Sequence, residues 1–286
     1  MNELATPQPV VVGIDGSRAA IRAALWAVDE AVSRDAPLRL LCAIEQDDNQ
    51  QTDPGDAARK LAAARMALRG AIMAIEGAGK PVRIETGVTH RPAIGSLIRA
   101  SASAAMVCVG AVGLRHFRPG RVGSTAAAVA VSARCPVAII RAREHHLYRP
   151  AHRIVVEVDA SPDNGVLLGA AMEEARLRNS AVQAIICRRT APGNNGAADA
   201  EGNHLALADL ERRLAGWRRR HPDLVVDSVA VRGSLLEYLA NHCRSVRLVI
   251  VGARDHHRLG ELVGPAGNAI LQDADCSLLI VNRQHL

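Results

Sequence analysis

The chain has 286 residues, 49% of them hydrophobic and 22% charged, with a formal net charge of +6. This length suits two globular domains, and the lack of an apolar run of about eighteen residues excludes a membrane-spanning helix. The basic excess is five residues in 1–147 and one in 148–286. That charge suits an anionic ligand in the first half and is too mild to indicate nucleic-acid binding.

The first half alternates short β-branched runs with longer helical patterns, which predicts right-handed crossovers and an α/β, doubly wound parallel sheet. Strands are predicted near 9–14, 38–44, 82–88, 105–110 and 136–141, and helices near 17–33, 56–76, 93–102 and 123–133. Four apolar residues of the first helix recur at spacings of four, three and four, which predicts a core-facing stripe. They are Ile21, Leu25, Val28 and Val32. Ser17 is placed to cap this helix.

The second half repeats the first. Residues 10–17, VVVGIDGS, reappear at 154–161 as IVVEVDAS. Residues 107–111 and 135–140 have counterparts in the same order at 249–253 and 276–281. These matches predict a duplicated domain, with residues 1–147 forming the first copy, residues 148–286 the second, and residues 143–152 the linker.

A glycine-rich segment follows the fourth predicted strand, at the edge where open parallel sheets bind ligands. Gly110, Gly113, Gly123 and Ser124 have the spacing G-x2-G-x9-G-S. Glycine allows close approach of a ligand and positive φ, and the start of the following helix favours a phosphate. Ser124 and Thr125 add hydroxyl groups. The residues between, Arg115, His116, Arg118 and Arg121, could neutralise charge; a plain loop before a capped helix is the alternative.

This spacing resembles the ATP loop of the universal stress proteins. The opening VVVGIDGS and the CPV of residues 135–137 are also similar to that family. The resemblance covers essentially the whole chain twice, as in tandem-domain proteins of actinobacterial type. It implies two tandem, Rossmann-like five-stranded sheets in the order 3-2-1-4-5, with adenosine across the switch point.

The resemblance also implies ATP as the ligand, with Mg²⁺ as a candidate companion ion. Asp15 would meet the adenosine, although a turn before Gly16 would also explain an aspartate there. Ala43 would offer backbone to the adenine. The ribose side would be lined by Val109 and Gly110, and the phosphates would be held by Gly113, Gly123, Ser124 and Thr125.

In the second copy the phosphate side is altered. Asp255 replaces the second glycine, eight residues separate it from Gly264, and Pro265 replaces the serine. A carboxylate would repel phosphate, and proline lacks both a hydroxyl and an N–H. We therefore expect one ATP per chain, in the first copy. Because Asp159 and Gly252 persist, the adenosine side of the second copy is expected to be partly intact.

The function expected from the resemblance is that of a cytoplasmic, ATP-binding regulatory or stress-response protein, homodimeric and with an unidentified protein partner. The segment offers no nucleophile, base or lysine for group transfer, so no catalytic residue is assigned and hydrolysis should be slow at most. The alternatives are a slow ATPase or nucleotidyl transferase on the same fold, and a nucleic-acid-binding module, which the 2% aromatic content weakens.

Four other features are discounted. The six cysteines show no CxxC spacing and several lie in apolar runs, as expected of buried side chains in a reducing cytoplasm. The N-terminus lacks the pattern of a secretory signal. Three adjacent residues, 255–257, cannot easily converge on one metal ion, so no metal ligand is assigned. The arginines of residues 212–220 indicate a solvated helix face, with a phosphate-binding patch as the alternative.

Overall fold

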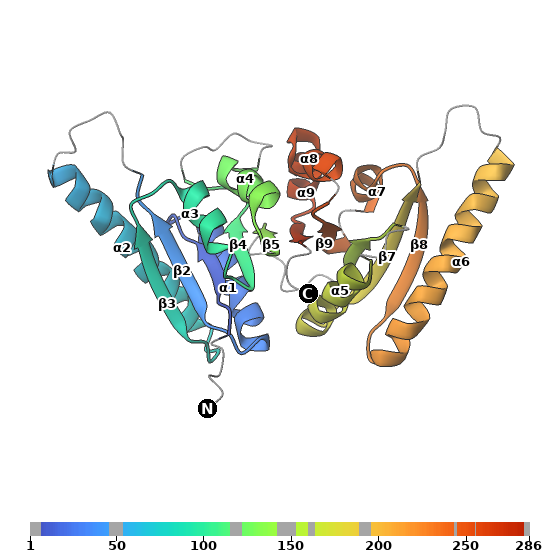
Figure 1. Cartoon of the computed structure of the whole chain (residues 1–286), viewed down its shortest axis with the longest axis horizontal. Coiled ribbons are helices and arrows are strands. Elements are labelled where there is room, and N and C mark those ends of the chain that lie inside the picture. The colour runs from blue at the N-terminus through green and yellow to red at the C-terminus, as the bar shows by residue number, and fades with distance from the viewer. Residues whose placement is uncertain are drawn as a thin grey trace. The chain divides into compact units, whose positions relative to one another are not determined.

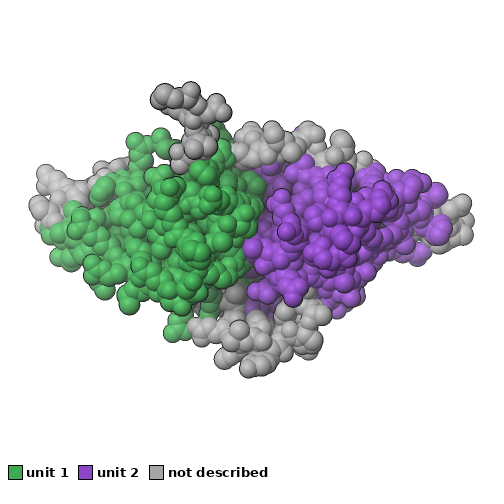
Figure 2. Space-filling view, turned by 90° about the horizontal axis from the view of Figure 1, so that it is seen from below, with its two compact units in different colours: residues 1–142, 284–286 green, residues 143–283 purple. Residues whose placement is uncertain are grey.

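The computed structural model describes residues 7–45, 54–114, 122–141, 153–159, 164–188, 196–242, 245–254 and 256–282. The chain forms two compact units, residues 1–142 with 284–286 and residues 143–283, coloured separately in Figure 2. The predicted division between residues 147 and 148 lies outside the described residues and stays a prediction.

The first unit alternates strands and helices, as its sequence pattern predicts (Figure 1). Its elements are β1 (Val10–Gly13), α1 (Arg18–Ser33), β2 (Leu38–Ala43), α2 (Pro54–Gly77), β3 (Ile84–Thr89), α3 (Ala93–Ala100), β4 (Met106–Gly110), α4 (Ser124–Ser132) and β5 (Val137–Ile140). The strands are parallel and lie in the order β3-β2-β1-β4-β5, which confirms the predicted topology.

Helices cover both faces of this sheet, which makes it doubly wound. Helices α1 and α2 pack together, α1 over β1 and β4 and α2 over β2 and β3. Helices α3 and α4 pack together, α3 against β1 and β2 and α4 against β5. Strands β1, β4 and β5 are almost fully buried, because a parallel sheet covered on both faces exposes neither to water, whereas the edge strand β3 is partly exposed.

The face of α1 that meets the sheet differs from the predicted stripe. Leu25 is 37% exposed and Val32 is 40% exposed, so the stripe prediction was wrong for these two residues. The buried face is made mostly of small side chains: Ala20, Ala23, Ala24, Ala27, Val28 and Ala31. Alanine lets the helix lie close to the sheet, which periodicity alone does not reveal. The N-cap prediction is confirmed, because the Ala20 amide donates to Ser17 Oγ at 3.1 Å.

The second unit has the same strand order with one additional helix. Its elements are β6 (Arg153–Glu157), α5 (Asn164–Arg178), β7 (Ala181–Arg188), α6 (Gly196–Arg220), β8 (Val226–Arg232), α7 (Leu235–His242), β9 (Val246–Gly252), α8 (His256–Val263), α9 (Pro265–Asp273) and β10 (Ser277–Val281). The strands are parallel in the order β8-β7-β6-β9-β10, equivalent to that of the first unit.

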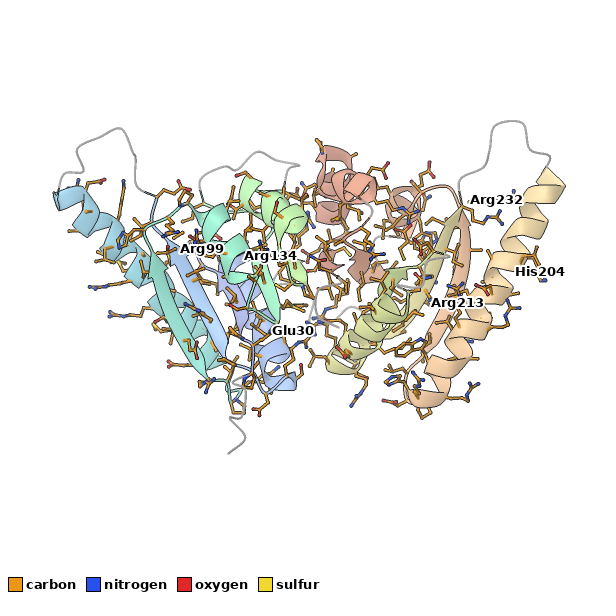
Figure 3. The ribbon with its side chains drawn as sticks, viewed as in Figure 1. Glu30, Arg99, Arg134, His204, Arg213 and Arg232 are labelled. Atoms are coloured by element: carbon orange, nitrogen blue, oxygen red, sulfur yellow. The ribbon has the colours of Figure 1, made fainter. Side chains whose placement is uncertain are left out.

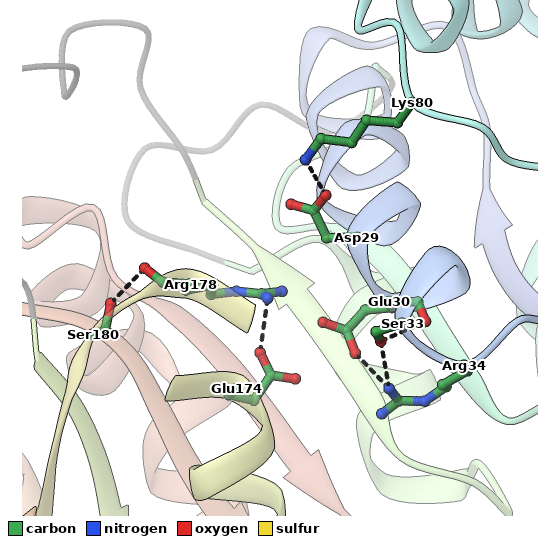
Figure 4. Close-up of polar contacts among 8 residues, drawn as sticks. All are labelled: Asp29, Glu30, Ser33, Arg34, Lys80, Glu174, Arg178 and Ser180. Atoms are coloured by element: carbon green, nitrogen blue, oxygen red, sulfur yellow. Dashed lines mark hydrogen bonds and ion pairs between the residues drawn. The ribbon is translucent and has the colours of Figure 1, made fainter. Parts of the chain in front are cut away.

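The repeat extends to side-chain contacts within equivalent helices. In α1, Arg34 Nη1 lies 3.1 Å from Glu30 Oε2. In α5, Arg178 Nη1 lies 3.2 Å from Glu174 Oε2 (Figure 4). Both pairs are spaced i,i+4, so they support the helix locally. Among the described helices, none is long and apolar enough to cross a membrane.

Candidate functional site

Asp15 lies directly after β1 and connects two parts of the first unit. Its Oδ1 accepts a hydrogen bond from the Ser17 amide at 2.9 Å, at the start of α1. Its Oδ2 accepts one from the Leu114 amide at 3.1 Å, in the segment after β4. The carboxylate is exposed at the carboxyl edge of the sheet. Asp15 and the glycine-rich segment therefore meet at one edge, as the sequence predicts. The contact with the Ser17 amide also agrees with the alternative that Asp15 is a turn residue before Gly16.

Two of the glycines are explained by close contacts within the protein. A Cβ on Gly113 would lie 2.7 Å from Asp15 Oδ2, so a side chain there would displace the carboxylate. A Cβ on Gly110 would lie 2.6 Å from the backbone carbon of Ala19 in α1. Gly110 thus permits the close packing of α1 on β4, in addition to any part it takes beside a ribose.

Gly123 differs from Gly110 and Gly113 because a side chain there would meet no close contact. Its φ is also negative, although glycine allows a positive φ. It is the N-cap of α4 with φ −57° and ψ 143°, a conformation open to any residue. A Cβ would have its nearest neighbours at 3.6 Å, the carbonyl oxygen of Ala111 and the amide nitrogen of Gly113. Gly123 therefore does not use the positive φ that glycine allows. A Cβ there would make ordinary van der Waals contacts at the start of α4.

The start of α4 has the properties of an anion site. Gly123 has no side chain, so the N-cap residue does not itself satisfy the N–H groups of the first turn. Ser124 is exposed and Thr125 is partly exposed, so their hydroxyl groups can reach a ligand. The helix dipole adds partial positive charge at this end. The cationic residues of 115–121 lie outside the described residues.

The strand ends complete this edge. Ala43 ends β2 and is partly exposed, while Val109 is only 4% exposed, so its side chain belongs to the core and only its backbone could meet a ligand. Burial, and then the negative charge of Asp15, raise the pKa of the Cys42 thiol beside them. Cys42 therefore stays protonated and is not a nucleophile.

At the equivalent edge of the second unit, the backbone of Asp159 is held differently. Its amide donates to Asn164 Oδ1 at 3.1 Å, and its carbonyl accepts from Arg213 Nη1 at 3.3 Å. Arg213 comes from α6 and is labelled in Figure 3. In the first unit it is instead the Asp15 side chain that reaches the segment after the fourth strand.

The larger difference is Glu157, the last residue of β6, which occupies the position of Gly13. Its side chain is 4% exposed and forms a short ion pair with Arg258 of α8. Burial, and then the negative charge and hydrogen bond of Glu157, raise the pKa of the Cys187 thiol to about 12. Cys187 is the counterpart of Ala43. The sequence analysis missed this pair, although the change from Gly13 to Glu157 is visible in the repeat.

The phosphate side of the second unit contains a helix. Residues 256–263 form α8, which packs against α9. A Cβ on Gly264 would lie 2.6 Å from the Gly260 carbonyl oxygen, whereas a Cβ on its counterpart Gly123 would have its nearest atoms at 3.6 Å. Pro265 occupies the first turn of α9 without an N–H. Asp255 lies outside the described residues.

The remaining candidate clusters are explained by pairing. Asp209 forms ion pairs with Arg212 and Arg213 of α6 at 2.9 and 2.6 Å. Glu211 pairs with Arg218 at 2.5 Å. These contacts favour the solvated helix face over a phosphate-binding patch. Within the described part of the chain, no group of three or more His, Cys, Asp or Glu side chains could hold a metal ion.

Comparison with known proteins agrees with this architecture. Residues 7–141 and 150–282 each match the universal stress protein family. The chain is 54% identical to universal stress protein Rv2028c of Mycobacterium tuberculosis over the full length of both chains. It is 39% identical to Rv2624c of the same organism, over 97% of each chain. A crystal structure of a universal stress protein from Archaeoglobus fulgidus superposes on 97% of each chain with a TM-score of 0.70, at 14% identity.

Proposed function

Because the chain belongs to the universal stress protein family, we propose that its first unit binds ATP and that the protein acts as a nucleotide-dependent regulator. The observation that carries this proposal is the meeting of Asp15 with the glycine-rich segment at one sheet edge, through the Leu114 amide at 3.1 Å. That edge is where doubly wound sheets bind nucleotides.

The polar groups of this edge fit the two ends of ATP. The uncapped start of α4, with the hydroxyls of Ser124 and Thr125, suits the phosphates. Asp15 and the backbone of Ala43 suit the nucleoside, since a carboxylate can accept hydrogen bonds from ribose hydroxyls. Mg²⁺ would arrive with the phosphates and keep most of its water ligands, so it needs no dedicated cluster of carboxylates.

Regulation would follow from the contact between Asp15 and Leu114. The same carboxylate that would meet the nucleoside also holds the segment after β4. A bound nucleotide would therefore change how the segment after β4 is held at Leu114, and with it a surface that a protein partner could read. The cytoplasmic location, the homodimer and the partner implied by the family resemblance remain proposals.

A regulator fits this edge better than an enzyme does. Both oxygens of Asp15 already accept backbone hydrogen bonds, so the carboxylate is engaged in holding the chain at this edge. The raised pKa of Cys42 argues against a thiolate nucleophile. We expect ATP turnover far below the median enzyme rate of about 10 per second. Sustained phosphate release near that rate, lost in Asp15→Ala, would favour the slow-ATPase alternative.

Calorimetric titration of ATP into the nucleotide-free full chain tests the proposal. We expect one site per chain with a dissociation constant in the micromolar range, which corresponds to a binding free energy of about −8 kcal/mol. Gly123→Val should abolish binding, because its side chain would crowd the phosphates at the start of α4, while the backbone conformation there is open to any residue. Gly70→Val is the matched control, since Gly70 is exposed on α2 and has no atom within 4 Å of its Cβ position. Undiminished binding by a folded Gly123→Val variant would refute the assignment.

A further inference from the structure

We infer that Glu157 and Arg258 determine which unit accepts a nucleotide: their ion pair occupies the nucleoside position of the second unit and excludes adenosine from it. This inference rests on the proposed function, because it takes the strand-end edge of the first unit as the nucleotide site. It corrects the expectation that the adenosine side of the second copy is partly intact.

The first argument is position. Glu157 ends β6 as Gly13 ends β1, each at the centre of its five-strand order. A Cβ on Gly13 would lie 3.2 Å from Leu97 Cδ1 of α3 and 3.4 Å from Val109 Cγ1 of β4. A side chain at this position is therefore directed toward the face of the sheet that α3 covers, where α4 packs beside α3. In the second unit that direction is taken by a carboxylate with 4% exposure.

The second argument concerns the side chains that contact the Glu157 carboxylate. Glu157 forms its ion pair with Arg258, which is 30% exposed on α8. Its charge and hydrogen bond also help to raise the pKa of the Cys187 thiol. Cys187 is the counterpart of Ala43, the residue that the resemblance assigns to the adenine. The pair thus extends from the adenine end of the edge to the helix that replaces the phosphate segment.

The third argument is space. The cavity that remains beside the pair has a volume of about 20 Å³. It is lined by residues that include Glu157, Cys187, Ser234, Leu235, Arg258 and Leu262. That volume is enough for about one water molecule, whereas ligand pockets measure about 300–1,000 Å³. A nucleoside could enter only by displacing the ion pair, and the buried carboxylate would then lose the guanidinium that offsets its desolvation.

The charge of the lining works in the same direction. Glu261, one turn after Arg258 on α8, also lines the cavity, so a second acidic side chain lies beside the ion pair. Acidic side chains at this edge disfavour the phosphates of a nucleotide. Size and the acidic lining therefore act together against ATP in the second unit.

Photolabelling of the full chain with 8-azidoadenosine tests this inference, because a nucleoside probe does not depend on the phosphate segment. In the parent protein we expect labelled peptides from the first unit only. Glu157→Gly with Arg258→Ala restores the glycine of the first unit and removes the guanidinium. In this double variant we expect the probe to label peptides of the second unit at least tenfold more strongly than in the parent protein. Labelling of the first unit should be unchanged, and unlabelled adenosine should compete with the probe.

The control is Glu173→Ala with Arg176→Ala, which removes the same two charges from the exposed face of α5 and should leave the labelling unchanged. If the double variant does not fold by circular dichroism, Glu157→Ala repeats the test, since Arg258 can then turn toward solvent. A folded variant whose second unit stays unlabelled while the first is labelled overturns the inference. A parent protein with no labelled peptide in its first unit overturns the proposed function instead.

Discussion

The two units share one fold and differ at one edge of it. Their strand orders are equivalent, and both keep an i,i+4 ion pair in the first helix. At the carboxyl edge, however, the first unit has Gly13 and a Gly123 whose Cβ position has no atom nearer than 3.6 Å, while the second has Glu157 and a Gly264 whose Cβ position lies 2.6 Å from the Gly260 carbonyl oxygen of α8. The comparison teaches that buried strands maintain the architecture, whereas a few residues at the strand ends decide whether a ligand fits.

The largest difference we expect concerns the glycine that ends the fourth strand of each unit. Gly110→Ala should destabilise the first unit by about 3 kcal/mol, because its Cβ would lie 2.6 Å from the backbone of Ala19. Gly252→Ala should change stability by about 0.5 kcal/mol or less, because the nearest atom, Leu167 Cδ1, is 3.7 Å away. Urea unfolding of the full-length variants measures both. Equal losses would show that the two first helices pack alike.

A second difference is the ion pair between Glu157 and Arg258, for which Gly13 of the first unit offers no carboxylate. Arg258→Ala should destabilise that unit by about 2 kcal/mol, because it removes the guanidinium that offsets the buried charge of Glu157. The estimate is below the range for fully buried pairs because Arg258 is 30% exposed. Glu157→Ala combined with Arg258→Ala should cost less than Arg258→Ala alone. Hydrogen exchange of the amides along β6 and β7 measures the stability of the second unit. A larger loss of stability in the double variant than in Arg258→Ala would contradict this prediction.

The aspartate after the first strand provides a smaller test. Asp15→Ala removes the acceptor for the Ser17 and Leu114 amides and should weaken ATP binding about tenfold, or about 1.4 kcal/mol. Asp159→Ala, the matched change in the second unit, should leave the ATP affinity as it is. Calorimetry on both variants compares them. A similar weakening in both would mean that the nucleotide depends on the second unit as well.

The smallest effect is expected at Cys187. Its pKa is raised from the ordinary 9.0 to about 12, so the folded state favours the neutral thiol. The stability that this contributes is kept below about pH 9 and is lost as the pH rises toward 12. Glu157→Gln removes one cause of the shift, so iodoacetamide should modify Cys187 somewhat faster at pH 9. Cys135, whose pKa is raised mainly by burial, is the internal control and should not change.

Much of the architecture could be predicted from the sequence because it depends on local and repeated patterns. The β-branched runs predicted the strands of the first unit to within about two residues, and the offset between residues 10–17 and 154–161 predicted the second copy. The position of Asp15 beside the glycine-rich segment also followed, because parallel strands bring their carboxyl ends to one edge. The division of the chain near residues 147 and 148 and the nucleotide-contact residues themselves remain predictions.

The sequence by itself therefore determined the family, the duplicated α/β fold and the edge at which the candidate site lies. Only the tertiary structure decided that the alanine face of α1 meets the sheet, that Gly110 is needed for that packing, and that Gly123 is unstrained. It also decided that Glu157 meets Arg258, about a hundred residues further along the chain. The physical reason is that periodicity and motif spacing report local preference, whereas close packing and buried charge depend on which distant side chains the fold brings together.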